Sequence, residues 1–182
     1  MAEKEVDSAA IQTIRPGEVD EDFLLLNPTQ ALPTLADREG VIQSARVIVE
    51  YLDERYPHPS MMPLSPSGRA RVRMTLHRID NELFPLAAKM RGTGAEASAA
   101  RTALVQGLLD GARFFPSRGY FFGSEYTLAD AAWAVLFRRL LASSVTIPRD
   151  ASSMIAYAER LFARPAFLRC FNSTPKSVSR KA

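Results

Sequence analysis

The stretch NPTQALPTLADREGVIQSARVIVEYLDERYPHP, residues 27–59, decides the fold of the first part of the chain. Its residue pattern predicts one strand over residues 34–37 and a second at residues 41–42, and the glycine between them indicates a β-hairpin. A helix is predicted over residues 44–55, because apolar side chains recur there at helical spacing and Pro57 cannot continue it. These apolar side chains are Val47, Ile48, Tyr51 and Leu52.

Two shorter elements are predicted before this stretch. The run AAIQTI, residues 9–14, has strand character and is followed by an Arg-Pro-Gly breaker. Residues 20–26 are acidic first and apolar last, which predicts a turn of helix that closes at Asn27 and Pro28. Together with the hairpin and its helix, these elements predict an α/β domain over residues 1–56.

A proline-dense segment follows this domain. Residues 56–68 hold four prolines and one glycine, a composition that interrupts helices and favours an extended path. We therefore expect residues 57–68 to be a linker. Beyond it the pattern is helical over residues 69–172, and the polar, basic residues 173–182 are expected to form a disordered tail.

The helical part begins with a long amphipathic helix. Its apolar residues recur at steps of three and four, which places them on one stripe, and Pro85 is expected to kink the helix. Further helices are predicted over residues 95–115, 127–142 and 152–162, joined by short loops, so the second domain is an all-α bundle. The stripe consists of Val72, Leu76, Ile79, Leu83, Leu86 and Met90.

Composition narrows the class of protein. The 182 residues are 47% hydrophobic and 24% charged, as in an ordinary globular protein. The sequence shows neither an apolar run of about 18 residues nor a signal segment, so we expect a cytoplasmic protein without a membrane span. One cysteine, Cys170, excludes an internal disulfide, and two histidines are too few for most metal clusters. We expect no metal and no cofactor.

Charge is divided unevenly along the chain. Residues 1–60 hold 5 basic and 12 acidic side chains and the remaining residues hold 18 basic and 8 acidic ones, giving net charges of −7 and +10. Such a dipole suits a protein that docks on a charged macromolecule, although two solvated faces of opposite sign have the same composition. The arginines of residues 69–78 are not interleaved with aromatic residues that stack on bases, so direct reading of nucleic acid is not expected.

Thr127 and Asp130 form a capping box at the start of a predicted helix. The Thr127 hydroxyl can accept from the Asp130 amide, and the Asp130 carboxylate can reach back to the Thr127 amide. This role is structural whatever the function of the protein.

Two residue pairs near the hairpin have a possible binding role. Leu32 precedes Pro33 at the start of a strand, where a cis peptide bond would turn backbone groups outward to pair with an extended ligand. Gln43 and Ser44 begin the next helix, where Ser44 can be a plain N-cap or the free amides can hold a carboxylate.

The spacing of these motifs resembles the glutathione-transferase superfamily over nearly the whole chain. The shared parts are Asn27-Pro28, Leu32-Pro33, Gln43-Ser44, the helix that follows and the Thr127–Asp130 box. The resemblance implies a thioredoxin-like N-terminal domain, incomplete at its start, followed by a helical-bundle C-terminal domain. The run YLDERYPHP, residues 51–59, with Met62-Pro63 and residues 76–79 after it, is similar to the stringent starvation protein A family of bacteria.

This family resemblance implies a function. Such proteins bind RNA polymerase holoenzyme, including its sigma factor, and change promoter use through a surface built around a Pro-His-Pro turn, here Pro57, His58 and Pro59. Two prolines fix the backbone on either side of the imidazole, which reduces the entropy lost on docking. The alternative is that the turn merely stiffens a linker. The resemblance also implies a homodimer.

The N-terminal segment that carries the catalytic residue of a glutathione transferase is not recognisable in this sequence. In that superfamily the first strand and helix carry the Tyr, Ser or Cys that activates the glutathione thiol. Residues 2–6 resemble the end of that helix, and we expect the reading frame to continue upstream of Met1. The alternative function is a glutathione transferase whose catalytic N-terminus is missing from this chain, with glutathione as its cofactor. The glutathione-site positions, vestigial in a binding protein, are Leu32, Pro33, Gln43 and Ser44.

Overall fold

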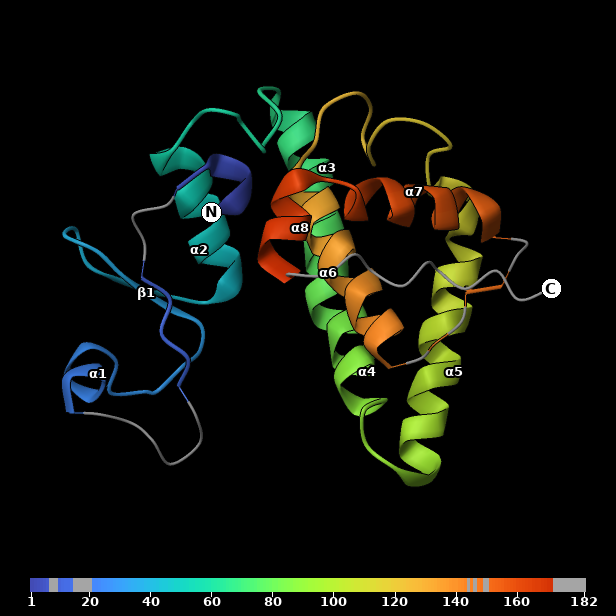
Figure 1. Ribbon diagram of the computed structural model, residues 1–182, viewed down its shortest axis with the longest axis horizontal. Helices are drawn as coiled ribbons and strands as arrows, with labels where there is room; N and C mark the ends of the chain where they lie inside the picture. The colour runs from blue at the N-terminus through green and yellow to red at the C-terminus, as the bar shows by residue number, and fades with distance from the viewer. Residues whose placement is uncertain (7–9, 15–20, 144, 146, 149–150, 172–182) are drawn as a thin grey trace. The chain divides into compact units, whose positions relative to one another are not determined.

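The structure is a computed structural model (Figure 1), which describes residues 1–6, 10–14, 21–143, 145, 147–148 and 151–171. The chain divides into two compact units, Met1–Ser60 and Met61–Ala182. The division falls within the proline-dense segment predicted from the sequence. The expected disordered tail, residues 173–182, lies outside the described residues.

The first unit is built around a two-stranded antiparallel hairpin. β1 (Thr34–Ala36) pairs with β2 (Val41–Gln43). The Asp37 carboxylate closes the connecting turn by accepting from the Gly40 amide at 3.2 Å. α2 (Ala45–Arg55) packs against both strands. The hairpin and the helix after it are therefore confirmed.

Two short helical elements precede the hairpin. η1 (Ala2–Lys4) is a single 3-10 turn, and α1 (Glu21–Leu26) is the predicted turn of helix. The strand predicted over residues 9–14 is wrong. Residues 10–14 form no strand and Ile11 is 86% exposed, while the residue before them lies outside the described part. Among the described residues the sheet consists of β1 and β2, so this segment has no strand to pair with.

The second unit contains the start of a helix where an extended linker was expected. α3 (Pro66–Arg78) begins inside the segment 57–68, so residues 66–68 form its first turn. Ser65 caps this turn by accepting from the Gly68 amide at 3.1 Å. A proline is well tolerated at the first helical position, because an N–H there has no intrahelical partner to lose. Pro66 therefore starts a helix instead of preventing one.

The predicted stripe helix is continuous but irregular. α3 runs into the π-helical turn η2 (Ile79–Leu83) and then α4 (Phe84–Lys89). Pro85 lacks the N–H that a regular helix uses at this position, and the wider π turn ends two residues before it, close to where a kink was expected. The stripe faces the core. Leu86 is partly buried, and the exposed fraction is 3% or less for each of the other residues, Val72, Leu76, Ile79, Leu83 and Met90.

The remaining elements of the second unit are α5 (Gly94–Asp110), η3 (Ala112–Phe114), α6 (Leu128–Ala142), α7 (Ser152–Phe162) and α8 (Pro165–Phe171). α6 is the central helix, since it packs against α3, α4 and α7 (Figure 1). α8 was not predicted, because a seven-residue helix is too short to show a helical period. None of the helices in the described ranges is long and apolar enough to cross a membrane.

The buried Asp130 carboxylate joins three parts of the second unit. Both halves of the predicted capping box are present, and Asp130 Oδ2 accepts from the Thr127 amide at 2.8 Å. Asp130 Oδ1 accepts from the Phe121 amide at 2.8 Å and from the Tyr157 hydroxyl at 2.6 Å. Burial, and then the adjacent carboxylate, raises the pKa of Tyr157 far above its ordinary value, so its hydroxyl stays protonated and donates. The box is therefore structural, as expected.

Candidate partner-binding site

The Pro57–His58–Pro59 turn directly follows α2. The helix ends with the Tyr56 amide donating to the Leu52 carbonyl at 3.1 Å, and the three turn residues after it are exposed. The His58–Pro59 peptide bond is cis. The imidazole therefore stands in solvent between two pyrrolidine rings whose φ angles are fixed. A ring that can both donate and accept hydrogen bonds, on a backbone of low entropy, is well suited to directional contacts with a partner.

The buried Lys4 side chain anchors this turn through hydrogen bonds to its backbone. Its side chain is 3% exposed, and its ammonium donates to the Tyr56 carbonyl at 2.7 Å and to the Pro59 carbonyl at 2.5 Å. The third partner is the Asp53 carboxylate of α2, whose side chain is 6% exposed. An ammonium has three donors, and these contacts match that number. The carbonyls on either side of Pro57 and His58 are thus tied to one buried charge and to α2.

The sequence pattern does not predict Lys4 as part of the site. A signal exists in α2, where Asp53 lies beside Leu52 and four residues after Val49, on the side of the helix that is buried. A carboxylate in such a position requires a cation or several hydrogen bonds. The sequence does not say which cation, because Lys4 and Asp53 are separated by 49 positions.

The hairpin brings the four glutathione-site positions together. Thr34 pairs with Gln43, so Pro33 and Ser44 both flank the open end of the hairpin. The Leu32–Pro33 peptide bond is cis, as predicted, and the Leu32 side chain is 59% exposed. These residues therefore share one surface of the first unit.

Ser44 does not cap α2 with its side chain. It occupies the N-cap position with φ 75° and ψ 121°, and its hydroxyl makes no capping hydrogen bond. A helix cap normally has a negative φ, so the sharp left-handed turn at Ser44 accounts for the loss of this bond. The plain N-cap interpretation is wrong for the side chain, and Ser44 is exposed at the hairpin end.

Gln43 is held by a buried asparagine. Gln43 Nε2 donates to Asn27 Oδ1 at 2.6 Å, and Asn27 is fully buried. Asn27 Nδ2 in turn donates to the Ala31 carbonyl at 2.8 Å and to Thr34 Oγ1 at 2.9 Å. Asn27 therefore fastens the loop before β1 to the last residue of β2, and the Gln43 amide group has a structural partner within the protein.

Comparison with known proteins identifies the family. Residues 2–60 match the family described as the glutathione S-transferase N-terminal domain. The chain is 38% identical over 181 residues to the stringent starvation protein A homolog of Pasteurella multocida, covering 98% of this chain and 85% of that protein. It is 37% identical over 169 residues to the homolog of Coxiella burnetii, covering 92% and 80%. The chain belongs to the stringent starvation protein A family.

The solved structures agree with this assignment. A glutathione S-transferase from Rhodospirillum rubrum F11 is 26% identical and superposes with a TM-score of 0.75, covering 98% of this chain and 88% of that one. The thioredoxin-like plus helical architecture is thereby confirmed. In this member of the stringent starvation protein A family, the transferase-type hairpin and the Lys4-held turn belong to the same unit.

Proposed function

We propose that this chain regulates transcription in the cytoplasm by binding RNA polymerase holoenzyme, including its sigma factor, through Pro57, His58 and Pro59, and that this action involves no catalysis. The observation that carries the proposal is the exposed His58 ring on a turn whose two ends are tied to the buried Lys4 ammonium. Such a turn loses little conformational entropy when a partner docks on it. Membership of the stringent starvation protein A family supports the same function.

The charge of the first unit favours a basic docking surface on the polymerase. The sequence of this unit carries 5 basic and 12 acidic side chains, a net charge of −7. Opposite charges on two partners accelerate encounter and suppress wrong orientations, and added salt screens this effect. The proposed association should therefore weaken as the salt concentration rises.

The test is a titration of purified holoenzyme with His58→Ala and with His77→Ala as a matched control. Both histidines are exposed, but His77 lies on α3 in the second unit, where its ring contacts Asn81. We expect His58→Ala to weaken binding about 30-fold, as for an interface anchor worth ~2 kcal/mol, and His77→Ala to leave it unchanged. Neither should change thermal stability much, since surface truncations cost less than ~0.5 kcal/mol. Equal affinity of both variants for holoenzyme would rule out His58 as an anchor.

A glutathione transferase is the second candidate function. It is favoured by the cis Leu32–Pro33 bond and by the exposed, uncapped Ser44 at the same end of the hairpin. The measurement is thiol transfer from glutathione to a generic electrophile, run beside the polymerase titration. Two results together would favour the enzymatic function over the binding function. The unmodified chain would have to turn over glutathione, and His58→Ala would have to bind polymerase as tightly as the unmodified chain.

We also propose that the chain forms a homodimer, in which the first half of the stripe helix contacts the first unit of a second copy. The opposite net charges of the two units, −7 and +10, favour such a pairing. Sedimentation at tens of micromolar protein should show a species of twice 20.1 kDa that dissociates at high salt. A 20.1 kDa species under low-salt conditions would contradict the dimer.

A further inference from the structure

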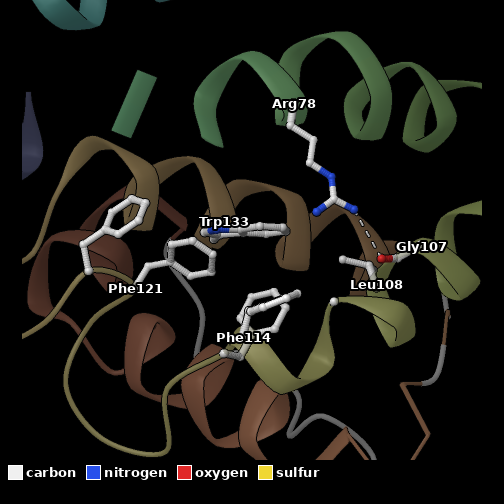
Figure 2. Close-up of a pocket in the computed structure, with 9 residues that line it drawn as sticks. Arg78, Gly107, Leu108, Phe114, Phe121 and Trp133 are labelled. Atoms are coloured by element: carbon white, nitrogen blue, oxygen red, sulfur yellow. Dashed lines mark hydrogen bonds between the residues drawn. The ribbon is translucent and has the colours of Figure 1, made fainter. Parts of the chain in front are cut away.

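A cavity of about 270 Å³ lies within the second unit, beneath the side chain of Arg78 (Figure 2). Its wall comes from α3, the end of α5, η3, α6 and the loop before α6. Aromatic rings supply most of that wall, among them Phe114, Phe121 and Trp133. A cavity of ~150 Å³ is enough for benzene, so this one has room for an aromatic ring with a short side chain. It is smaller than the pockets that hold drug-sized ligands, which begin at ~300 Å³.

The guanidinium of Arg78 gives the cavity a chemical preference. Arg78 spans one side of it, with Nη2 3.5 Å from the Gly107 carbonyl and Nε 3.5 Å from Glu82, and its side chain is 47% exposed. Both contacts are long, so the guanidinium can turn to a better acceptor. Trp133 is 3% exposed, and its Nε1–H has no hydrogen-bond partner among the described residues. This nitrogen lies at the end of the indole that is farther from Arg78 (Figure 2), so the preference of the cavity for an anion comes from Arg78.

Gly107 contributes to this wall without a side chain. Glycine in the interior of a helix is less stable than alanine, and α5 contains Gly107 in its second half. A Cβ added there would meet no heavy atom within 4 Å, so close packing does not require the glycine. Gly107 lines the cavity, and its carbonyl lies 3.5 Å from Arg78 Nη2.

We propose that this cavity binds a small aromatic carboxylate, with the ring among Phe114, Phe121 and Trp133 and the carboxylate on Arg78. Aromatic walls favour a planar apolar body, and a guanidinium favours a carboxylate, which it can bind through two parallel hydrogen bonds. This binding activity is independent of the proposed polymerase contact at His58, which belongs to the other unit.

The test uses the fluorescence of Trp133, the single tryptophan of the chain, in the full-length protein. The probes are 3-phenylpropionate, its neutral amide 3-phenylpropanamide, and hexanoate, which has the charge without the ring. We expect a saturable change in Trp133 emission with 3-phenylpropionate. The affinities of the other two probes should be at least 10-fold weaker, because the amide loses the charged hydrogen bond to Arg78 and hexanoate loses the burial of the ring.

Three variants decide the assignment. Arg78→Gln should weaken binding of 3-phenylpropionate about 10-fold and leave that of the amide unchanged, whereas Arg71→Gln on the same helix should change neither. Gly107→Leu should fill the cavity and abolish binding of both ring probes. The proposal is overturned if emission does not saturate, if Arg78→Gln and Arg71→Gln bind alike, or if folded Gly107→Leu still binds. Should Gly107→Leu fail to fold, the Arg78→Gln and amide comparisons decide alone.

Discussion

At the scale of single residues, the buried Lys4–Asp53 pair is the feature on which the proposed site depends. Lys4→Met removes the ammonium and leaves the Asp53 carboxylate buried without it. Removing one partner of a buried ion pair typically costs 3–5 kcal/mol, so we expect a loss of about that size in the stability of the first unit. Chemical denaturation followed through a probe in α2 measures this loss.

The matched control is Lys89→Met. Lys89 pairs with Glu96 at 3.3 Å, but both side chains are more than half exposed, and an exposed pair is worth at most ~1 kcal/mol. A second readout separates positioning from stability: relaxation of the His58 ring signals should show that the turn becomes mobile in folded Lys4→Met. If His58 stays as rigid as in the parent, Lys4 does not position the turn.

Individual residues were predictable only where their partners are near in sequence. The Thr127–Asp130 box was foreseen because both groups lie within one helical turn. Lys4 and Asn27 were not foreseen as organising residues. Lys4 acts on Asp53, 49 positions away, and Asn27 reaches Gln43, 16 positions away. Such contacts depend on the folded path of the chain and leave no local pattern.

At the scale of elements, a side-chain bond fastens the hairpin to α2. The Tyr51 hydroxyl of α2 donates to the Asp37 carboxylate in the hairpin turn. This bond, and then the Glu39 amide, lowers the pKa of Asp37 below its ordinary value. The stabilisation is therefore fully present above the unfolded-state pKa of Asp37 and is lost as the pH falls through the lower pKa of the folded state.

Tyr51→Phe should raise the pKa of Asp37 toward its ordinary value, because the first cause of the shift is removed. A titration of the Asp37 carboxyl carbon by NMR between neutral pH and about pH 2 gives the value directly. Tyr56→Phe is the control: Tyr56 is the C-cap residue of the same helix but is not among the groups that shift the pKa of Asp37. An unchanged pKa of Asp37 in Tyr51→Phe would show that the bond is not made in solution.

Elements were predictable where packing and local pattern agree. α6 shows helical spacing of apolar side chains because it buries one face. α2 shows the same spacing less cleanly, since Ile48 is buried but Val47 is 53% exposed. The strand predicted at residues 9–14 failed because a strand requires a neighbour, and residues 10–14 have none in the described sheet. α3 starts earlier than predicted because Ser65 caps it and Pro66 is tolerated at the first helical position, although a proline inside a helix would break it.

At the scale of the whole molecule, the two units are stabilised by different forces. The main cluster of buried apolar residues extends from Ile79 to Phe167 and lies entirely in the second unit. In the described part of the first unit, the buried residues are Ile48 and three polar ones, namely Lys4, Asn27 and Asp53. Apolar burial is the dominant favourable term in folding, so the first unit depends to an unusual degree on one ion pair and one hydrogen-bond network.

We therefore predict that the first unit opens separately from the second, at a lower free energy. In native-state hydrogen exchange, amides of α2 should exchange through an opening of lower free energy and smaller denaturant dependence than amides of α6. Lys4→Met should lower the protection of the α2 amides against exchange further and leave that of the α6 amides unchanged, because the three hydrogen bonds of the Lys4 ammonium all go to residues of the first unit. Were Ile48 and Leu136 to exchange with the same free energy and the same denaturant dependence, the chain would unfold as one cooperative body. In that case the polar network of the first unit would have to be as stabilising as the aromatic core of the second.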